Sequence, residues 1–326
     1  MNIPLPGPAR MTLLLLVAVP ALMAYPWSST RERWVLAVGL LVLVALLAWW
    51  RGLHLSTIAR RWLAMSRSGG GLHTDQRSGS DAHATAVLRV APSDTGALPV
   101  ALITGYLNRY GLQADAVRVT SRDGRSDTGE ALRDIWIGLT YSAARNLAAL
   151  QARSASIPLQ ETADVAVRRL ADHLREIGWE TALVGSDDLP ELVAGSARET
   201  WRTLVDSSAG STSYVAAYRV GVDDALSDTL AEIRGYGARE TWTAVEVADD
   251  GHDHRTVAAA CALRTSEPPH GGAPLPELVP QQGSHRSAVL VLDPLSGRLL
   301  DGHTPMSDVA IEGLRWPTMR AAATRT

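Results

Sequence analysis

Two long apolar runs separated by a short polar one open the chain. Met11–Trp27 and Trp34–Trp50 contain no charged side chain, and the connector Ser28–Arg33 is too short to be a domain. Runs of this length and composition are typical of membrane-spanning helices. Tryptophans lie at both ends of the second run, as expected at membrane–water interfaces. The pattern therefore predicts an amino-terminal segment at residues 1–10 and a two-helix transmembrane hairpin at residues 11–50.

Arginine positions predict the orientation of this hairpin. Two arginines lie in the connector, whereas Arg51, Arg60, Arg61 and Arg67 follow the second run. Because cytoplasmic flanks are enriched in basic residues, both chain ends are predicted to lie in the cytoplasm, with the protein multi-pass in the inner membrane. A signal peptide ending near Ala24 is the alternative, and it also leaves the large domain inside.

Residues 51–82 combine a basic amphipathic stretch with a linker. Leu53, Leu55, Ile58, Trp62 and Met65 interleave with arginines, which favours a helix lying on anionic headgroups or on a partner. Continuation of the second span with snorkelling arginines is an equal alternative. Ser66 to Asp81 is a Gly- and Ser-rich linker. The candidate membrane-interface or partner contacts are Trp34, Trp49, Trp50, Arg51, Arg60, Arg61 and Trp62.

Residues 83–302 form a predicted cytoplasmic α/β domain in which one order of elements occurs twice. Strands are expected at Thr85–Val90, Ala114–Thr120 and Ile135–Tyr141 with a helix at Leu98–Tyr110, and again at Tyr214–Val220, Trp242–Val247 and Thr256–Leu263 with a helix at Asp223–Arg234. Turns are expected at Asp123-Gly124 and Asp250-Gly251. This order suggests a βαββ internal repeat, although glycine caps and Asp-Gly turns are common enough to match by chance.

Two further helices are predicted between the copies, at Ala143–Ala152 and Gln160–Ile177. The apolar stripe of the second is expected to consist of Val165, Val167, Leu170, Leu174 and Ile177. A strand at Thr181–Val184 completes a β-α-β-β-α-β order. The fold class is therefore α/β in the α+β sense, an antiparallel-rich α/β sandwich. A short strand is expected at Ala288–Leu292, and residues 303–326 are expected to form a loose carboxyl-terminal tail.

Composition excludes several kinds of chemistry. A net charge of −3 gives no basic face for nucleic acid. Cys261 is the only cysteine, so neither a disulfide within the chain nor a cysteine zinc cluster can form. The chain contains no lysine, which removes P-loop, Schiff-base and kinase lysines. We expect no cofactor.

Candidate catalytic or metal-binding groups are few. His252 and His254 lie in an acidic hairpin that could hold zinc or manganese, but a solvated turn explains it better because no third ligand is evident. Asp172 and His173 are adjacent on a helix, so they do not share a face. We therefore assign no catalytic, cofactor or metal residue.

Two near-identical stretches, Glu199–Arg202 and Glu240–Thr243, each contain Glu-Thr-Trp. Glutamate and tryptophan together could indicate ligand binding. No glycine-rich cradle or nearby base accompanies them. The preferred interpretation is that the glutamate and threonine begin a secondary-structure element and that the tryptophan is buried in the core.

These stretches, in this order behind two membrane helices, resemble the EccE family of mycobacterial type VII (ESX) secretion systems, most closely the member linked to iron acquisition. The resemblance runs from the first apolar run to about Arg264. It is carried by Trp49-Trp50, Asn146–Ser154, Ile157–Gln160, Arg168–Glu176 and the two Glu-Thr-Trp stretches.

The resemblance implies a non-catalytic structural subunit of an inner-membrane secretion complex, with EccB, the EccC ATPase and EccD as partners besides the lipid bilayer. It supplies no active-site residue. The alternatives are a membrane-tethered transferase or hydrolase, motivated by the His252 and His254 hairpin, and a two-helix sensor whose soluble domain binds a small ligand.

Overall fold

The computed structural model of the chain divides into two compact units, residues 1–70 and 71–326. The structure describes residues 49–50, 53–54, 83–91, 97–125, 131–152, 158–207, 210–249, 254–269 and 272–316.

The described part of the first unit is a minimal hairpin. Strands β1 (Trp49–Trp50) and β2 (Leu53–His54) pair antiparallel, with Trp49 opposite His54. The prediction that a membrane helix continues to Trp50 is therefore wrong for its last two residues, and no helix includes Leu53 or His54. A physical reason is that tryptophan favours strands.

Most of the predicted membrane anchor lies outside the described residues. This applies to Met11–Trp27, to residues 34–48 and to the candidate contacts Trp34, Arg51, Arg60, Arg61 and Trp62. Among the helices that the structure describes, none combines the length and the apolarity needed to cross a bilayer.

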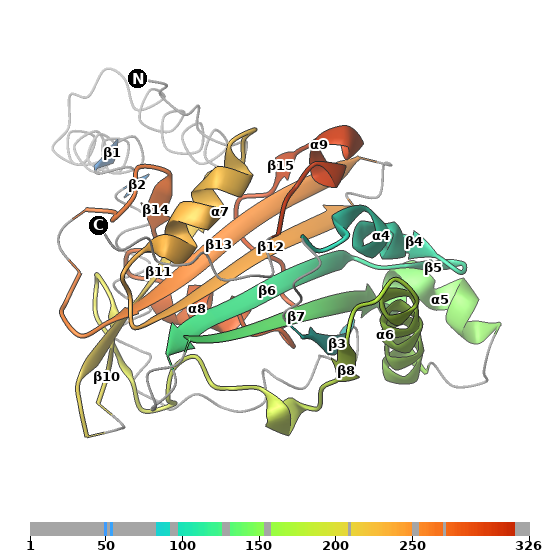
Figure 1. Ribbon diagram of the computed structural model, residues 1–326, viewed down its shortest axis with the longest axis horizontal. Coiled ribbons are helices and arrows are strands. Elements are labelled where there is room, and N and C mark those ends of the chain that lie inside the picture. Colours follow the sequence, from blue (N-terminus) through green and yellow to red (C-terminus); the bar gives the residue numbers. More distant parts are fainter. Residues whose placement is uncertain are drawn as a thin grey trace, which may run out of the picture. The chain divides into compact units, whose positions relative to one another are not determined.

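The second unit is built on one large antiparallel sheet (Figure 1). Its eleven described strands include nine in the order β8-β3-β7-β6-β12-β13-β11-β10-β9, while β14 pairs with β11 and β15 with β13. Their bounds are β3 His83–Val90, β6 Ala116–Arg125, β7 Ala131–Ser142, β8 Thr181–Leu183, β9 Arg198–Glu199, β10 Leu204–Asp206, β11 Ser213–Val220, β12 Glu240–Asp249, β13 Arg255–Thr265, β14 Leu278–Pro280 and β15 Thr304–Pro305. The predicted antiparallel-rich fold is confirmed.

The βαββ internal repeat is present. The first copy is β3, α4 (Val100–Thr104), β6 and β7, and the second is β11, α7 (Leu226–Gly235), β12 and β13. β6 and β12 are each ten residues long, and β13 starts as far behind β12 as β7 starts behind β6. The copies meet where β6 pairs antiparallel with β12, so the sheet has an approximate two-fold axis at the pair Thr120 and Ala244.

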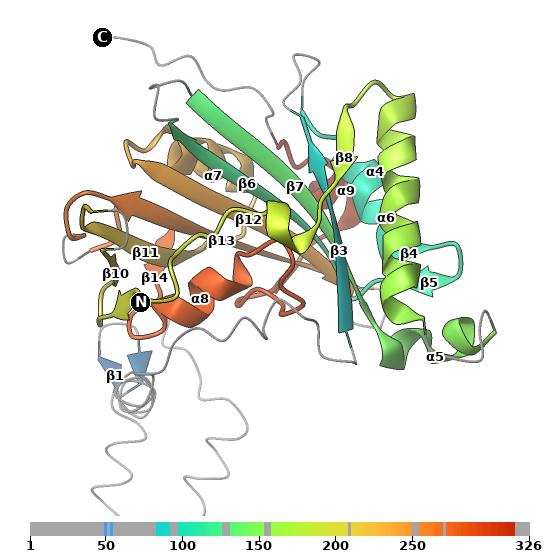
Figure 2. The same cartoon turned by 90° about the horizontal axis from the view of Figure 1, so that it is seen from below.

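Successive side chains of each strand point to opposite faces of this sheet, and both faces are buried. One face packs against α4, α6 (Leu159–Glu176), α7 and α9 (Asp308–Glu312). The other face packs against α8 (His285–Val291) and the segment from Leu189 to Ala197. Figures 1 and 2 show α7 and α8 on opposite sides of the strands. The result is a helix–sheet–helix sandwich.

Helix α5 (Ala143–Gln151) and α6 match the two helices predicted between the copies. Ser142 caps α5 by accepting from the Arg145 amide. The chain leaves α6 through Gly178, whose φ of 91° suits glycine. The predicted stripe is right at Val167, Leu170 and Leu174 but wrong at Val165 and Ile177. Val165 lies away from the buried face of the helix, and Ile177 follows its last residue.

Three further predictions, a turn, a helix and a strand, differ from the structure. The predicted turn at Asp123-Gly124 lies inside β6, where both residues pair with β12. Helix Leu98–Tyr110 is cut short: α4 gives way to a 3₁₀ turn (Gly105–Leu107) and to the hairpin of β4 (Asn108–Arg109) and β5 (Leu112–Gln113). The apolar run Ala288–Leu292 belongs to α8 rather than to a strand.

The chain after Gly302 is packed as far as Trp316, contrary to the expected loose tail. Ile311 in α9 is fully buried and Trp316 is 3% exposed. The Leu98 amide donates to the Trp316 carbonyl, which fixes the segment beside α4. The remaining residues, 317–326, lie outside the described part of the chain.

Candidate functional site

Among the described residues, the carboxylate and guanidinium side chains buried most deeply lie at the boundary between the two repeats. Arg118 on β6 lies directly opposite Glu246 on β12, and their side chains are 4% and 0% exposed. Two hydrogen bonds join them, from Arg118 Nη2 and Nε to Glu246 Oε2 at 2.5 and 2.8 Å. A buried charge needs such a partner because removing it from water is costly.

The remaining donors of Arg118 hold the chain that follows α8. Its Nη1 donates to the carbonyls of Val291 at 2.7 Å and Ser296 at 3.2 Å, and its Nη2 also donates to the carbonyl of Arg298. These residues are far from Arg118 in sequence. The guanidinium therefore fastens a carboxyl-terminal loop onto the centre of the sheet.

The second oxygen of Glu246 fastens the next stretch of the same loop. Oε1 accepts from the Leu300 amide at 2.8 Å and lies 2.9 Å from His303 Nε2. His303 Nδ1 in turn lies 3.0 Å from Thr256 Oγ1 on β13. Burial alone would raise the pKa of Glu246, but the Arg118 charge and these hydrogen bonds hold its pKa below the usual value. The carboxylate is thus ionised and fully used in holding the fold together.

A second group of ion pairs lies at the start of β12, around Glu240. Glu240 accepts from Arg122 Nε at 2.5 Å, from Arg264 Nε at 2.9 Å and from the Trp242 indole N–H at 3.0 Å. Trp242 is 1% exposed and stacks on Trp136 with ring centroids 5.4 Å apart. The interpretation of Trp242 as a buried anchor is confirmed, whereas Glu240 is an ion-pair partner within a strand rather than a helix cap.

The other Glu-Thr-Trp stretch has a different role. Glu199 on β9 accepts from the Arg286 amide at 3.1 Å, at the start of α8. Thr200 closes a local turn through its hydroxyl and the Thr203 backbone. Trp201 is only half-buried. The two copies of the motif therefore share residues but not an environment.

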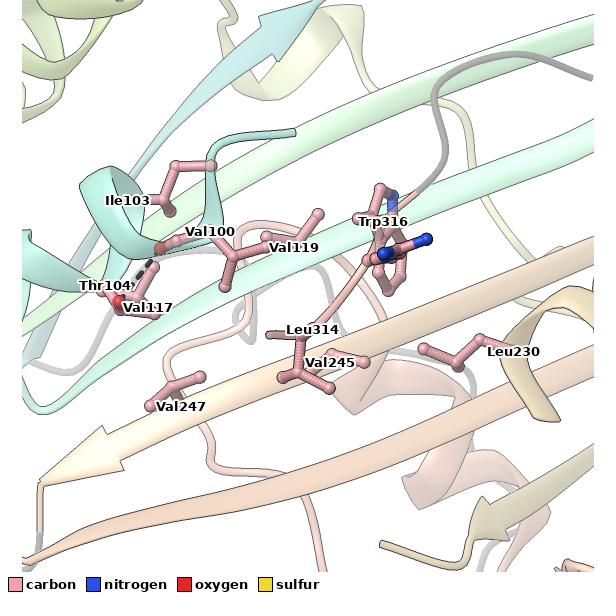
Figure 3. A pocket seen from close by; sticks show the side chains of 11 residues that line it. Val100, Ile103, Thr104, Val117, Val119, Leu230, Val245, Val247, Leu314 and Trp316 are labelled. Atoms are coloured by element: carbon pink, nitrogen blue, oxygen red, sulfur yellow. Dashed lines mark hydrogen bonds between the residues drawn. The ribbon is translucent and has the colours of Figure 1, made fainter. Parts of the chain in front are cut away.

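A small apolar cavity lies on the opposite face, close to the two-fold axis (Figure 3). Its volume is about 20 Å³, which is room for roughly one water molecule. The Thr104 hydroxyl at its wall already donates to the Val100 carbonyl. It is lined by Val100, Ile103, Thr104, Val117, Val119, Leu230, Val245, Val247, Leu314, Arg315 and Trp316. The cavity is too small for a substrate.

A wider open groove of about 550 Å³ runs beside β11 and β13. Tyr218, Tyr236, Arg239 and Glu267 contribute to its wall, together with prolines of the following loop. Its size suits a small molecule. In the described domain, this groove is the candidate site for the alternative hypothesis of a sensor whose soluble domain binds a small ligand.

The residues considered for chemistry do not converge. His252 lies outside the described residues, and His254 is exposed. His173 Nδ1 lies 2.9 Å from the Tyr106 hydroxyl, whereas Asp172 is exposed and pairs with Arg175 at 2.7 Å. Within the part of the chain that the structure describes, no three His, Cys, Asp or Glu side chains gather at metal-binding distances.

Comparison with known proteins gives a consistent answer. Residues 130–256 match the family model described as "Putative type VII ESX secretion system translocon, EccE". A Mycobacterium tuberculosis (strain CDC 1551 / Oshkosh) protein named "ESX-3 secretion system protein EccE3" is 50% identical over 324 residues, 98% of this chain and 95% of the relative. A Mycolicibacterium smegmatis protein of the same name is 48% identical over 296 residues, 90% of each chain.

Proposed function

This chain belongs to the EccE family, and we propose that it serves as a non-catalytic structural subunit of a type VII (ESX) secretion membrane complex that exports proteins across the inner membrane. The observation that carries the proposal is the near-complete overlap with its relatives: about half of the residues are identical over almost the full length of both chains. Such an overlap includes both the anchor region and the folded domain.

The use of the buried charges supports a structural role. Arg118, Glu246 and His303 hold a loop onto the sheet, and Glu240 joins strands β6, β12 and β13. These ion pairs rigidify the domain, and a rigid domain is suited to hold partner subunits in fixed positions. EccB, the EccC ATPase and EccD are the proposed partners.

We further propose that two membrane helices hold the folded domain at the cytoplasmic side of the inner membrane. The apolar runs at residues 11–27 and 34–50 and the arginine bias around them support this topology. Cysteine labelling can test it, because Cys261 is buried and burial raises the pKa of its thiol, so it gives little background.

In intact cells a membrane-impermeant maleimide is expected to label Ser29→Cys in the connector but not Ser266→Cys, which is exposed in the folded domain. After cell lysis both variants should react. Labelling of Ser266→Cys in intact cells would reverse the proposed orientation.

The functional proposal is tested by deleting the gene in its natural host. Secretion of the substrates of the system should stop, the ATPase activity of EccC should persist, and the tagged chain should co-purify with the other membrane subunits in mild detergent. Normal secretion by the deletion strain would refute the proposal.

A further inference from the structure

The tip of the β4–β5 hairpin carries an exposed aromatic residue in an unusual backbone conformation. Tyr110 and Gly111 connect the two strands, and their φ values are 57° and 70°. A two-residue hairpin loop with positive φ at both positions normally places Asn, Asp or Gly first, because bulky side chains rarely adopt this conformation. Tyr110 is 47% exposed, so much of this strained residue is open to solvent.

Two guanidinium groups lie against the Tyr110 ring. The guanidinium carbon of Arg169, on α6, is 4.5 Å from the ring centroid, and that of Arg109 is 5.4 Å away. Cation–π attraction holds both positive charges beside one ring. In the described part of the chain no carboxylate forms an ion pair with either arginine, whereas Arg175 on the same helix pairs with Asp172.

A buried anchor fixes this arrangement. The Tyr106 ring, 1% exposed, meets the Tyr110 ring edge-on at 6.3 Å, and Arg109 lies 5.0 Å from the centroid of Tyr106. The Tyr106 hydroxyl lies 2.9 Å from His173 Nδ1 on α6. The exposed ring and its two arginines therefore rest on rigid elements and are preorganised to bind.

We propose that Tyr110, Arg109 and Arg169 form a docking site for an acidic segment of another protein subunit, an inference that rests on the proposed function. Guanidinium groups without a counter-charge bind carboxylates through charge-assisted hydrogen bonds, and Tyr and Arg dominate the energetics of protein interfaces. A strained residue at the exposed tip of a hairpin is expected where binding requires it.

A protein segment fits this site better than a lipid surface. Helix α6 also exposes Asp172 and Glu176. A bilayer presents phosphates over a wide area and would bring them against these carboxylates. One or two acidic side chains of a peptide can reach the arginines without that repulsion.

The test uses the purified full-length chain in detergent and the membrane complex isolated from a strain that lacks it. Tyr110→Asn removes the ring and gives the turn its preferred residue, so relief of strain should offset the lost ring contacts and the unfolding temperature should stay within about 4 °C of the wild type. Its affinity for the complex, and that of Arg169→Gln, should fall about 30-fold, as for the loss of a central interface residue. Arg168→Gln, the same charge change at the exposed neighbour, should cost less than about 3-fold.

The outcomes separate the inference from the proposed function. If the wild-type chain fails to bind the complex, the proposed function is wrong; if it binds and Tyr110→Asn binds equally well, only the docking site is wrong. A photo-crosslinker at Val165, exposed one helical turn before Arg169, should capture an acidic segment of another subunit in cells. Crosslinking to lipid alone, or to no partner, would also overturn the inference.

Discussion

At the scale of single residues, the pair of Arg118 and Glu246 connects distant parts of the chain. A buried ion pair adds little net stability compared with an apolar pair of similar size, but removal of one partner leaves the other charge uncompensated. Because both side chains also hold the loop after α8, the pair couples the sheet to the carboxyl-terminal residues. The fold therefore depends on both charges being present together.

Glu246→Gln should lower the free energy of unfolding by about 3–5 kcal/mol, since the Arg118 charge stays buried without its counter-charge. Urea unfolding of the full-length chain measures this loss. Glu232→Gln, on the exposed side of α7, is the matched control and should change stability by less than about 0.5 kcal/mol. Similar effects of the two variants would contradict the role assigned to Glu246.

The pH dependence of the same variant gives a second readout. The folded-state pKa of Glu246 is lowered from its ordinary value of 4.5, so its contribution is complete above that pH and is lost as pH falls through the folded pKa. The stability difference between wild type and Glu246→Gln should therefore shrink in acid. A difference that is constant from neutral pH to about pH 3 would show that another group carries the acid sensitivity.

At the scale of elements, hydrophobic periodicity predicted most strands and both long helices correctly. Every strand expected in the two repeats exists, because strands buried on both faces read as short, nearly continuous runs of apolar and β-branched residues. The errors have local causes. Asp123-Gly124 looks like a turn in isolation, but pairing with β12 extends the strand through it, and the short run Ala288–Leu292 has no period that distinguishes strand from helix.

The two Glu-Thr-Trp stretches allow a matched comparison. Trp242→Ala should cost about 3–5 kcal/mol, because it opens a cavity beside Trp136 and removes a stacked pair. Trp201→Ala, in the half-buried copy, should cost less than half as much. Thermal unfolding of both variants provides the measurement, and equal losses would refute the assignment of Trp242 as the core anchor.

At the scale of the whole molecule, the family could be recognised from the sequence, but the candidate site could not. The resemblance to EccE relied on local stretches and is confirmed over almost the full chain. The pairing of Arg118 with Glu246 joins residues of different repeats, and the docking of residues 303–316 depends on a surface formed by both repeats. Single-sequence patterns carry no signal for such long-range contacts.

The packed carboxyl-terminal segment gives a prediction at this scale. Ile311 is fully buried against the sheet layer, whereas Val309 on the same short helix is 80% exposed. Ile311→Ala should destabilise the folded domain by about 2–5 kcal/mol, and Val309→Ala by less than about 0.5 kcal/mol. Protease resistance and thermal unfolding of the full-length variants measure this, and a loose segment would give two equally small effects.

The register across the β6–β12 boundary has a consequence for the history of this sheet. The third residue of each strand faces the seventh residue of the other, which is how two identical copies would pair around a two-fold axis. Two separate copies of the first βαββ repeat would place Arg118 opposite Arg122 twice, an arrangement of like charges. In the fused chain the seventh residue of β12 is Glu246 and the third is Trp242. The two equivalent positions of the boundary thus differ: Arg118 faces and pairs with Glu246, whereas Arg122 faces Trp242 and pairs with Glu240, an asymmetry unavailable to an assembly of identical halves.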